Sequence, residues 1–206
     1  MSFTKSSFLF LLIGAAMACS KPAQPQNTAS NIAPRATPVA VADVADHFAY
    51  PIGSTETVTA KKDKDAWFNE LEFGKDGNLG ENWTLNAGGN SSCGEPAYAI
   101  ANGFVAYSEF SGPEWGLVVI IEHRLNTGET IESLYGNLMD TSVRVGQTVK
   151  KRDRIGSVGN ANGRYLCRMH IEIRTSDSPS WDKPGPITSP DRTGWVDPSD
   201  FIDAHR

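Results

Sequence analysis

The chain has 206 residues, of which 39% are hydrophobic and 21% are charged, and its formal net charge at pH 7 is -5. This length and composition allow one ordinary hydrophobic core, so one folded domain is expected. The acidic balance and the lack of a Lys/Arg-rich run exclude the electrostatic footprint that nucleic-acid binding requires. No nucleic-acid partner is therefore expected.

The chain begins with the features of an export signal. Lys5 precedes an apolar run from Phe8 to Ala18, which is as long as a signal-peptide core and too short to span a bilayer. We expect residues 1–18 to be a signal peptide. The run ends in "AAMAC", which resembles the lipobox of bacterial lipoproteins and implies acylation of Cys19. Ser20 resembles the residue at this position in lipoproteins of the outer membrane that face the periplasm. A soluble periplasmic protein is the alternative.

The next segment, residues 19–48, is rich in Pro, Ala, Gln and Asn and has no sustained period of 2.0 or 3.6 residues. Such a sequence is typical of a flexible tether, with a random-coil reach of roughly 30 Å at this length. We therefore expect a lipidated flexible linker, which leads into a folded domain at residues 49–206. Through its lipid anchor the protein would have a membrane as one of its partners.

Two cysteines remain when Cys19 is set aside, and these are Cys93 and Cys167. An even pair in an oxidising compartment predicts a disulfide. Because the bridge closes a long loop, it is expected to contribute about 3 to 5 kcal/mol through the unfolded state. Two separately buried thiols are the alternative.

After residue 50 the sequence consists of short β-branched or aromatic runs separated by glycine and turn residues. They are "PAYAIANGFVAYSEF", "WGLVVIIEHR", "ETIESLYGNL", "SVRVGQTV", "DRIGSVG" and "RMHIEIRT". Without a convincing amphipathic helix between them, these runs predict an all-β, mostly antiparallel domain, built as a β-sandwich or an open, barrel-like sheet. Glu122, Glu132 and Glu172 fall on separate runs, and the sequence places no pair of them for acid/base work. The tail "TGWVDPSDFIDAHR" is expected to pack on the sheet.

Several elements between residues 73 and 174 follow one another as they do in a known family. They read "FGKDGNLGENW", "GEPAYAIANGFVAYS", "GLVVIIEHR", "ESLYGNL", "VRVGQTVKKRDRIGSVGNANGR" and "CRMHIEIR". In this order they resemble the LytM or lysostaphin-type zinc endopeptidase domain, which cleaves peptide cross-links in bacterial cell walls. The resemblance implies a LytM-type β-sheet fold for the domain.

The resemblance also implies where the functional positions of an active member fall. The H-x-x-x-D element falls on "NLGEN", so Asn78 and Asn82 stand at two zinc-ligand positions. The Tyr-x-His-Leu element falls on "YGNL", so Asn137 stands at a catalytic histidine. The H-x-H element falls on "RMH", so Arg168 replaces the other catalytic histidine and His170 keeps the third zinc-ligand position. One of the five family residues is present.

The substitutions predict a domain without resident metal, cofactor or catalytic residues. A hydrolytic zinc site needs three donors drawn from imidazole, thiolate and carboxylate, and a neutral amide is a poor donor for zinc. Arg cannot deprotonate and therefore cannot act as a general base. We interpret His170 as a relic of a metal site, and the five positions as a degenerate groove.

Three functions remain open. The first is a catalytically degenerate envelope lipoprotein, similar to the non-catalytic EnvC/NlpD class. It would bind peptidoglycan or a peptidoglycan hydrolase and regulate the hydrolase. The most specific version of this hypothesis is activation of an amidase. The second is an active zinc endopeptidase in which His170 is joined by other ligands, such as Glu81 or Asp76. The third is a passive peptidoglycan-binding lipoprotein.

Overall fold

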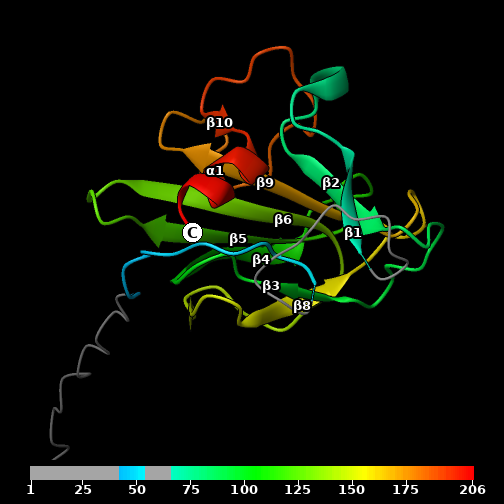
Figure 1. Ribbon diagram of the computed structural model, residues 1–206, viewed down its shortest axis with the longest axis horizontal. Helices are drawn as coiled ribbons and strands as arrows, with labels where there is room; N and C mark the ends of the chain where they lie inside the picture. Colours follow the sequence, from blue (N-terminus) through cyan, green and yellow to red (C-terminus); the bar gives the residue numbers. More distant parts are fainter. Residues whose placement is uncertain (1–41, 54–65) are drawn as a thin grey trace, which may run out of the picture. The chain divides into compact units, whose positions relative to one another are not determined.

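The computed structural model describes residues 42–53 and 66–206 of the chain (Figure 1). The predicted signal peptide, Cys19 and most of the predicted linker lie outside these residues. The elements are β1 (Trp67–Leu71), the 3-10 turn η1 (Lys75–Gly77), β2 (Glu81–Leu85), β3 (Pro96–Tyr98), β4 (Gly103–Phe110), β5 (Leu117–Arg124), β6 (Thr130–Thr141), β7 (Thr148–Val149), β8 (Arg154–Val158), β9 (Met169–Thr175), β10 (Trp195–Val196) and α1 (Pro198–Ala204).

The strands of the described residues form one sheet in the order β1-β2-β9-β6-β5-β4-β7. β10 pairs with β9, and β8 pairs with β6 and β3. Every strand pair is antiparallel. β1 and β7 lie at the two ends of the path, so the sheet is open. The predicted all-β, mostly antiparallel class is therefore confirmed. No helix in the described parts of the chain is long and apolar enough to cross a membrane.

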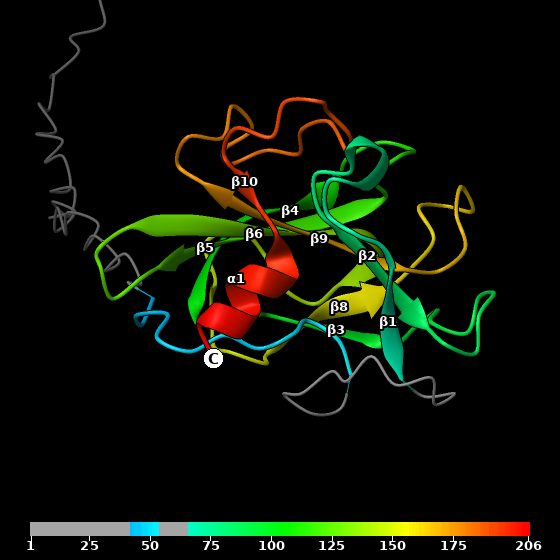
Figure 2. The same cartoon turned by 45° about the horizontal axis from the view of Figure 1, so that its top comes forward.

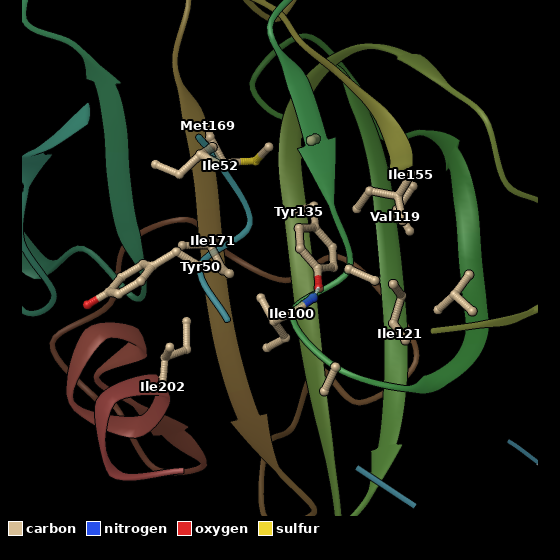
Figure 3. Packing of buried hydrophobic residues seen from close by; sticks show 14 of the residues in the cluster. Tyr50, Ile52, Ile100, Val119, Ile121, Tyr135, Ile155, Met169, Ile171 and Ile202 are labelled. Atoms are coloured by element: carbon tan, nitrogen blue, oxygen red, sulfur yellow. Dashed lines mark hydrogen bonds between the residues drawn. The ribbon is translucent and has the colours of Figure 1, made fainter. Parts of the chain in front are cut away.

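The two faces of the sheet carry different side chains. On one face Met169 and Ile171 of β9 pack with Tyr135 of β6 in the main hydrophobic core (Figure 3). Because side chains alternate along a strand, the residues between them point to the other face. That second face holds a smaller apolar cluster, which includes Trp115 and Leu134. His170 lies on it as well.

The N-terminal described segment, residues 42–53, packs on the main core. Ala45 and Phe48 are 3% exposed, and Ala45 forms a parallel bridge with Leu125. The Arg152 guanidinium donates to the Tyr50 carbonyl at 2.8 Å. Packing therefore begins before residue 49, where the sequence placed the start of the domain, because these two apolar side chains are buried within the supposed linker.

The C-terminal tail also packs on the sheet, as its apolar residues predicted. β10 pairs with β9, and Ile202 of α1 is fully buried in the main core. The Asp197 side chain accepts a hydrogen bond from the Asp200 amide at 3.1 Å and caps the helix.

The predicted disulfide is present. Cys93 and Cys167 are bonded, with their Cα atoms 5.1 Å apart. The Cys167 amide donates to Asn90 Oδ1 at 3.1 Å, and its carbonyl accepts from Thr84 Oγ1 at 3.2 Å. The residue directly before Arg168 is therefore fixed by a covalent bond and by two hydrogen bonds.

Candidate functional site

Four of the five family positions meet on neighbouring strands. His170 of β9 lies opposite Asn82 of β2 on one side and opposite Gly136 of β6 on the other. Asn137 follows Gly136, and Arg168, directly before β9, forms an antiparallel bridge with Gly159, directly after β8. The central position of β9 between β2 and β6 thus brings these side chains together.

The fifth position, Asn78, lies in the turn before β2. Its Nδ2 donates to the Gly80 carbonyl at 2.6 Å and to the Leu71 carbonyl at 3.2 Å, and its side chain is fully buried. Asn78 therefore holds the turn closed by bonding the backbone on both sides of it.

The His170 ring is enclosed and hydrogen-bonded at both nitrogens. Nδ1 lies 2.7 Å from Asn82 Oδ1, and Nε2 lies 3.3 Å from Glu172 Oε1. The Trp115 ring packs edge-on against the imidazole at 5.2 Å between centroids. His170 is 2% exposed. Both nitrogens that could bind a metal thus contact side-chain oxygens, under an aromatic cover.

Next to His170, on the same face of β9, lies a network of buried ionisable side chains. Glu172 Oε2 accepts from Trp195 Nε1 at 2.8 Å, and the Arg174 guanidinium lies 2.9 Å from Glu132 Oε2. Glu132, Glu172 and Arg174 are fully buried. Sequence reasoning missed this network, although the alternation of His170, Glu172 and Arg174 on one face was a signal for it.

The segment of residues 176–194, which we call the covering segment, lies across this face (orange to red in Figures 1 and 2). Arg174 Nη1 donates to the Ser180 carbonyl at 2.6 Å and to the Lys183 carbonyl at 2.8 Å. Trp115 Nε1 donates to the Gly185 carbonyl at 2.9 Å. The covering segment is thus held by the buried arginine and by the tryptophan that covers His170.

The approach of Trp115 requires a glycine in β6. A Cβ atom at Gly136 would lie 2.8 Å from the tryptophan ring. The Asn137 amide donates to the Trp115 carbonyl at 2.8 Å, and Asn137 has a positive φ of 60°. A side chain at position 136 would push the Trp115 ring away from His170. Gly136 and the left-handed Asn137 together therefore hold Trp115 over the imidazole.

Arg168 is the most open of the five positions. Its side chain is 23% exposed, whereas Asn78, Asn82, Asn137 and His170 are each at most 3% exposed. The guanidinium stacks on the Tyr165 ring at 4.0 Å and lies 3.7 Å from the Glu70 carboxylate. The Arg168 Nε and Asn137 Oδ1 atoms are buried without a hydrogen-bond partner.

A cluster of three carboxylates was not foreseen. Glu122 and Glu132 lie opposite each other in the β5–β6 register, and the Asp182 carboxylate is within 4.8 Å of both. Burial raises the pKa of Glu132 to about 7, against the opposing effect of Arg174, and burial raises the pKa of Glu122 to about 7 as well. The β5–β6 register brings together Glu122 and Glu132, which lie on separate runs of the sequence. Arg174 supplies a positive charge beside Glu132.

Glu81, which the sequence offered as a replacement metal ligand, does not face His170. Its Oε2 accepts from Trp83 Nε1 at 3.0 Å and from Ser199 Oγ at 2.8 Å, on the core side of β2. Burial raises the pKa of Glu81 to about 7. Its role in the described structure is to join α1 to β2.

We expect Glu81→Gln to be more stable than the parent by about 2 to 3 kcal/mol at pH 8 and equally stable at pH 4.5. The carboxyl ionises near 4.5 in the unfolded chain and near 7 in the folded one. The folded state therefore holds the proton more tightly, and stability falls as the pH rises from 4.5 to 7. Glutamine keeps an acceptor for Trp83 and Ser199 without the charge. Urea unfolding of both proteins at pH 4.5, 6 and 8 measures the effect; a pH-independent difference would contradict it.

The open antiparallel sheet, with His170 on its interior strand β9, agrees with a LytM-type fold. Residues 89–181 match the model of Peptidase family M23. This match spans a little under half of the chain and supports a LytM-type domain there.

Two curated relatives are similar to the chain. It is 28% identical over 136 residues to the cell division protein DipM of Caulobacter vibrioides, a match that covers 64% of this chain and 21% of that protein. It is 33% identical over 105 residues to the lipoprotein NlpD/LppB homolog of Pseudomonas aeruginosa, which covers 50% of this chain and 34% of that protein. The matches thus span a fifth to a third of the length of these relatives.

Among solved structures, the NMR solution structure of lysostaphin superimposes with a TM-score of 0.50 at 18% identity. The superposition covers 68% of this chain and 51% of that one. At this identity it shows a shared fold.

Proposed function

We propose that the chain is a cell-envelope protein whose LytM-type domain binds a partner through the surface around Arg168 and does not cleave peptides. The observation that carries this proposal is the enclosure of His170, with Asn82 on Nδ1, Glu172 on Nε2 and Trp115 over the ring. A hydrolytic zinc needs three donors and an open position for water. This arrangement offers neither.

The donor set supports the same reading. Among the described residues, one group of three His, Cys, Asp or Glu side chains has a spacing that could hold a metal ion. It consists of Glu122, Glu132 and Asp182, and His170 is not part of it. Glu172 already accepts a hydrogen bond from Trp195, and Asn82 contributes a neutral amide oxygen. These residues do not fit a hydrolytic zinc, and we assign no catalytic step to them.

The partner we propose is a peptidoglycan hydrolase, which the domain activates, with an amidase as the first candidate. The similarity to a cell division protein and to a lipoprotein homolog supports a peptidoglycan-related role in the envelope. The Arg168 guanidinium is held on Tyr165, is partly exposed, and lies 3.7 Å from the exposed Glu70 carboxylate. It can pair with a carboxylate on the partner in place of this solvent-exposed contact. Acylation of Cys19, with export by residues 1–18, would place the domain at the outer membrane, facing the periplasm.

Arg168→Glu is expected to reduce activation of the amidase by at least tenfold, because it turns a charge-assisted hydrogen bond into a repulsion. The measurement is release of dye from labelled peptidoglycan sacculi by a purified amidase, with and without the chain. Arg144→Glu makes the same charge change on an exposed arginine before β7 and is expected to leave activation unchanged.

Three results would overturn the proposal. Equal activation by the Arg168→Glu variant, with an unchanged circular dichroism spectrum, would remove Arg168 from the binding surface. Stoichiometric zinc, together with chelator-sensitive release of peptides from sacculi by the chain alone, would establish an endopeptidase. Cosedimentation with sacculi without any effect on a hydrolase would leave a passive binder.

A further inference from the structure

An open pocket of about 430 Å³ lies between the η1 turn and the covering segment. It lies beside Asn78, which bridges the lining residue Thr188, and its lining includes neither Arg168 nor His170. The η1 turn and the covering segment run side by side in Figures 1 and 2 and are joined by a hydrogen bond from the Ser189 amide to the Gly77 carbonyl at 2.8 Å. Among the residues that line it are Gly74, Asp76, Gly77, Thr188, Ser189 and Arg192. A cavity of this size is in the range of small-ligand sites.

The walls of the cavity on the η1 side depend on glycine. Gly74 and Gly77 each have a φ of 78°, which other residues adopt with strain. A Cβ at Gly74 would lie 2.5 Å from the Arg192 guanidinium. A side chain at this position would displace the arginine from the cavity wall, so the glycine keeps the cation where it is.

Two opposite charges face this cavity without meeting. The Asp76 carboxylate makes no ion pair or hydrogen bond with any described residue, although Asp76 and Arg192 line the same space. Arg192 Nη1 is held by the Gly74 carbonyl at 3.2 Å, and the guanidinium lies 5.7 Å from the Phe73 ring centroid. Asp76 is a short side chain on a left-handed residue, with φ 54°.

The neighbouring carboxylate does not neutralise the arginine. Asp191 turns back to its own loop, where it accepts from the Thr193 amide at 3.0 Å and from the Thr193 hydroxyl at 2.8 Å. These bonds hold the pKa of Asp191 below its ordinary value. Arg192 thus remains the cation of the cavity, opposite the anion Asp76.

We infer that this cavity binds a small zwitterion, a free amino acid or a short peptide, with the ligand ammonium at Asp76 and its carboxylate at Arg192. A pocket that already presents both charges, and in which the arginine is held by the Gly74 carbonyl, favours a ligand that carries both opposite charges. Both side chains are exposed to solvent, which keeps the affinity modest. This site is separate from the surface around Arg168, and the inference does not depend on the proposed amidase partner.

The test is an NMR titration of the isotope-labelled full chain with three probes. Glycylglycine carries both charges, N-acetylglycine carries the carboxylate alone, and glycinamide carries the ammonium alone. We expect glycylglycine to shift the amide signals of Gly74, Gly77 and Ser189, with an affinity at least tenfold higher than that of either single-charge probe.

Three variants make the assignment specific. Arg192→Gln is expected to abolish the preference for glycylglycine over glycinamide, and Asp76→Asn the preference over N-acetylglycine. Asparagine tolerates the left-handed backbone at position 76, so the second variant should keep the turn. Lys75→Gln removes an exposed cation from the same turn and should change nothing. Equal binding of the three probes, no signal shifts at these residues, or an unchanged preference in either cavity variant would overturn the inference.

Discussion

Arg174→Met is expected to lower the free energy of unfolding by about 3 to 5 kcal/mol. The arginine lies fully buried between Glu132 and Glu172, at 2.9 Å and 4.0 Å from their carboxylates. Methionine fills much of the same volume but leaves two acidic groups without their cation. The carbonyls of Ser180 and Lys183 also lose their donor. Urea unfolding at pH 7, followed by circular dichroism, measures the loss.

A double variant separates the lost charge from lost packing. Adding Glu132→Leu to Arg174→Met removes the carboxylate that the single variant leaves without its cation. We expect the double variant to recover at least about 1 kcal/mol of the unfolding free energy lost in Arg174→Met. Purely additive losses in the two single variants and the double variant would mean that the ion pair is not coupled. The covering segment should exchange its amide hydrogens faster in both variants that lack the arginine.

Removal of the disulfide by a paired Cys93→Ala and Cys167→Ala change is expected to cost about 4 to 5 kcal/mol of unfolding free energy. The bond joins residues 74 positions apart. Without it, the unfolded chain gains the freedom of a long loop, whereas the folded state keeps most of its contacts. Thermal and urea unfolding of the parent and the variant under oxidising conditions measure this difference.

A reducing agent provides the matched control for the disulfide. It should bring the parent to within about 1 kcal/mol of the double alanine variant and leave the variant unchanged. A parent that loses no stability on complete reduction would contradict the expectation. Because Cys167 directly precedes Arg168, reduction should also weaken partner binding if the domain acts through that arginine.

The strand pattern predicted much of the fold because alternation is a local property. In β9, alternation alone is enough to separate Met169 and Ile171, which lie in the core, from His170 and Glu172 on the other face. The cysteine count and the compartment were likewise enough to pair Cys93 with Cys167. These predictions needed no knowledge of distant contacts.

The remainder depended on contacts between distant parts of the chain. Trp115 lies in "SGPEWG", a turn-like stretch in which nothing indicates that its ring would cover His170 and bind the Gly185 carbonyl. The pairing of Glu122 with Glu132 follows from the β5–β6 register, which the sequence did not fix. The burial of Phe48 depends on the C-terminal helix, whose Phe201 ring lies 5.2 Å away.

The packing of residues 42–53 determines how tension would enter the domain. A pull from the N-terminal side acts first on the short parallel bridge at Ala45 and then on the carbonyl that Arg152 holds at Tyr50. β9 lies in the interior of the sheet, bonded to β2 and β6 on its two sides. A domain tethered to a membrane would therefore yield at this N-terminal strip first, and the geometry around Arg168 would survive forces that stretch the tether.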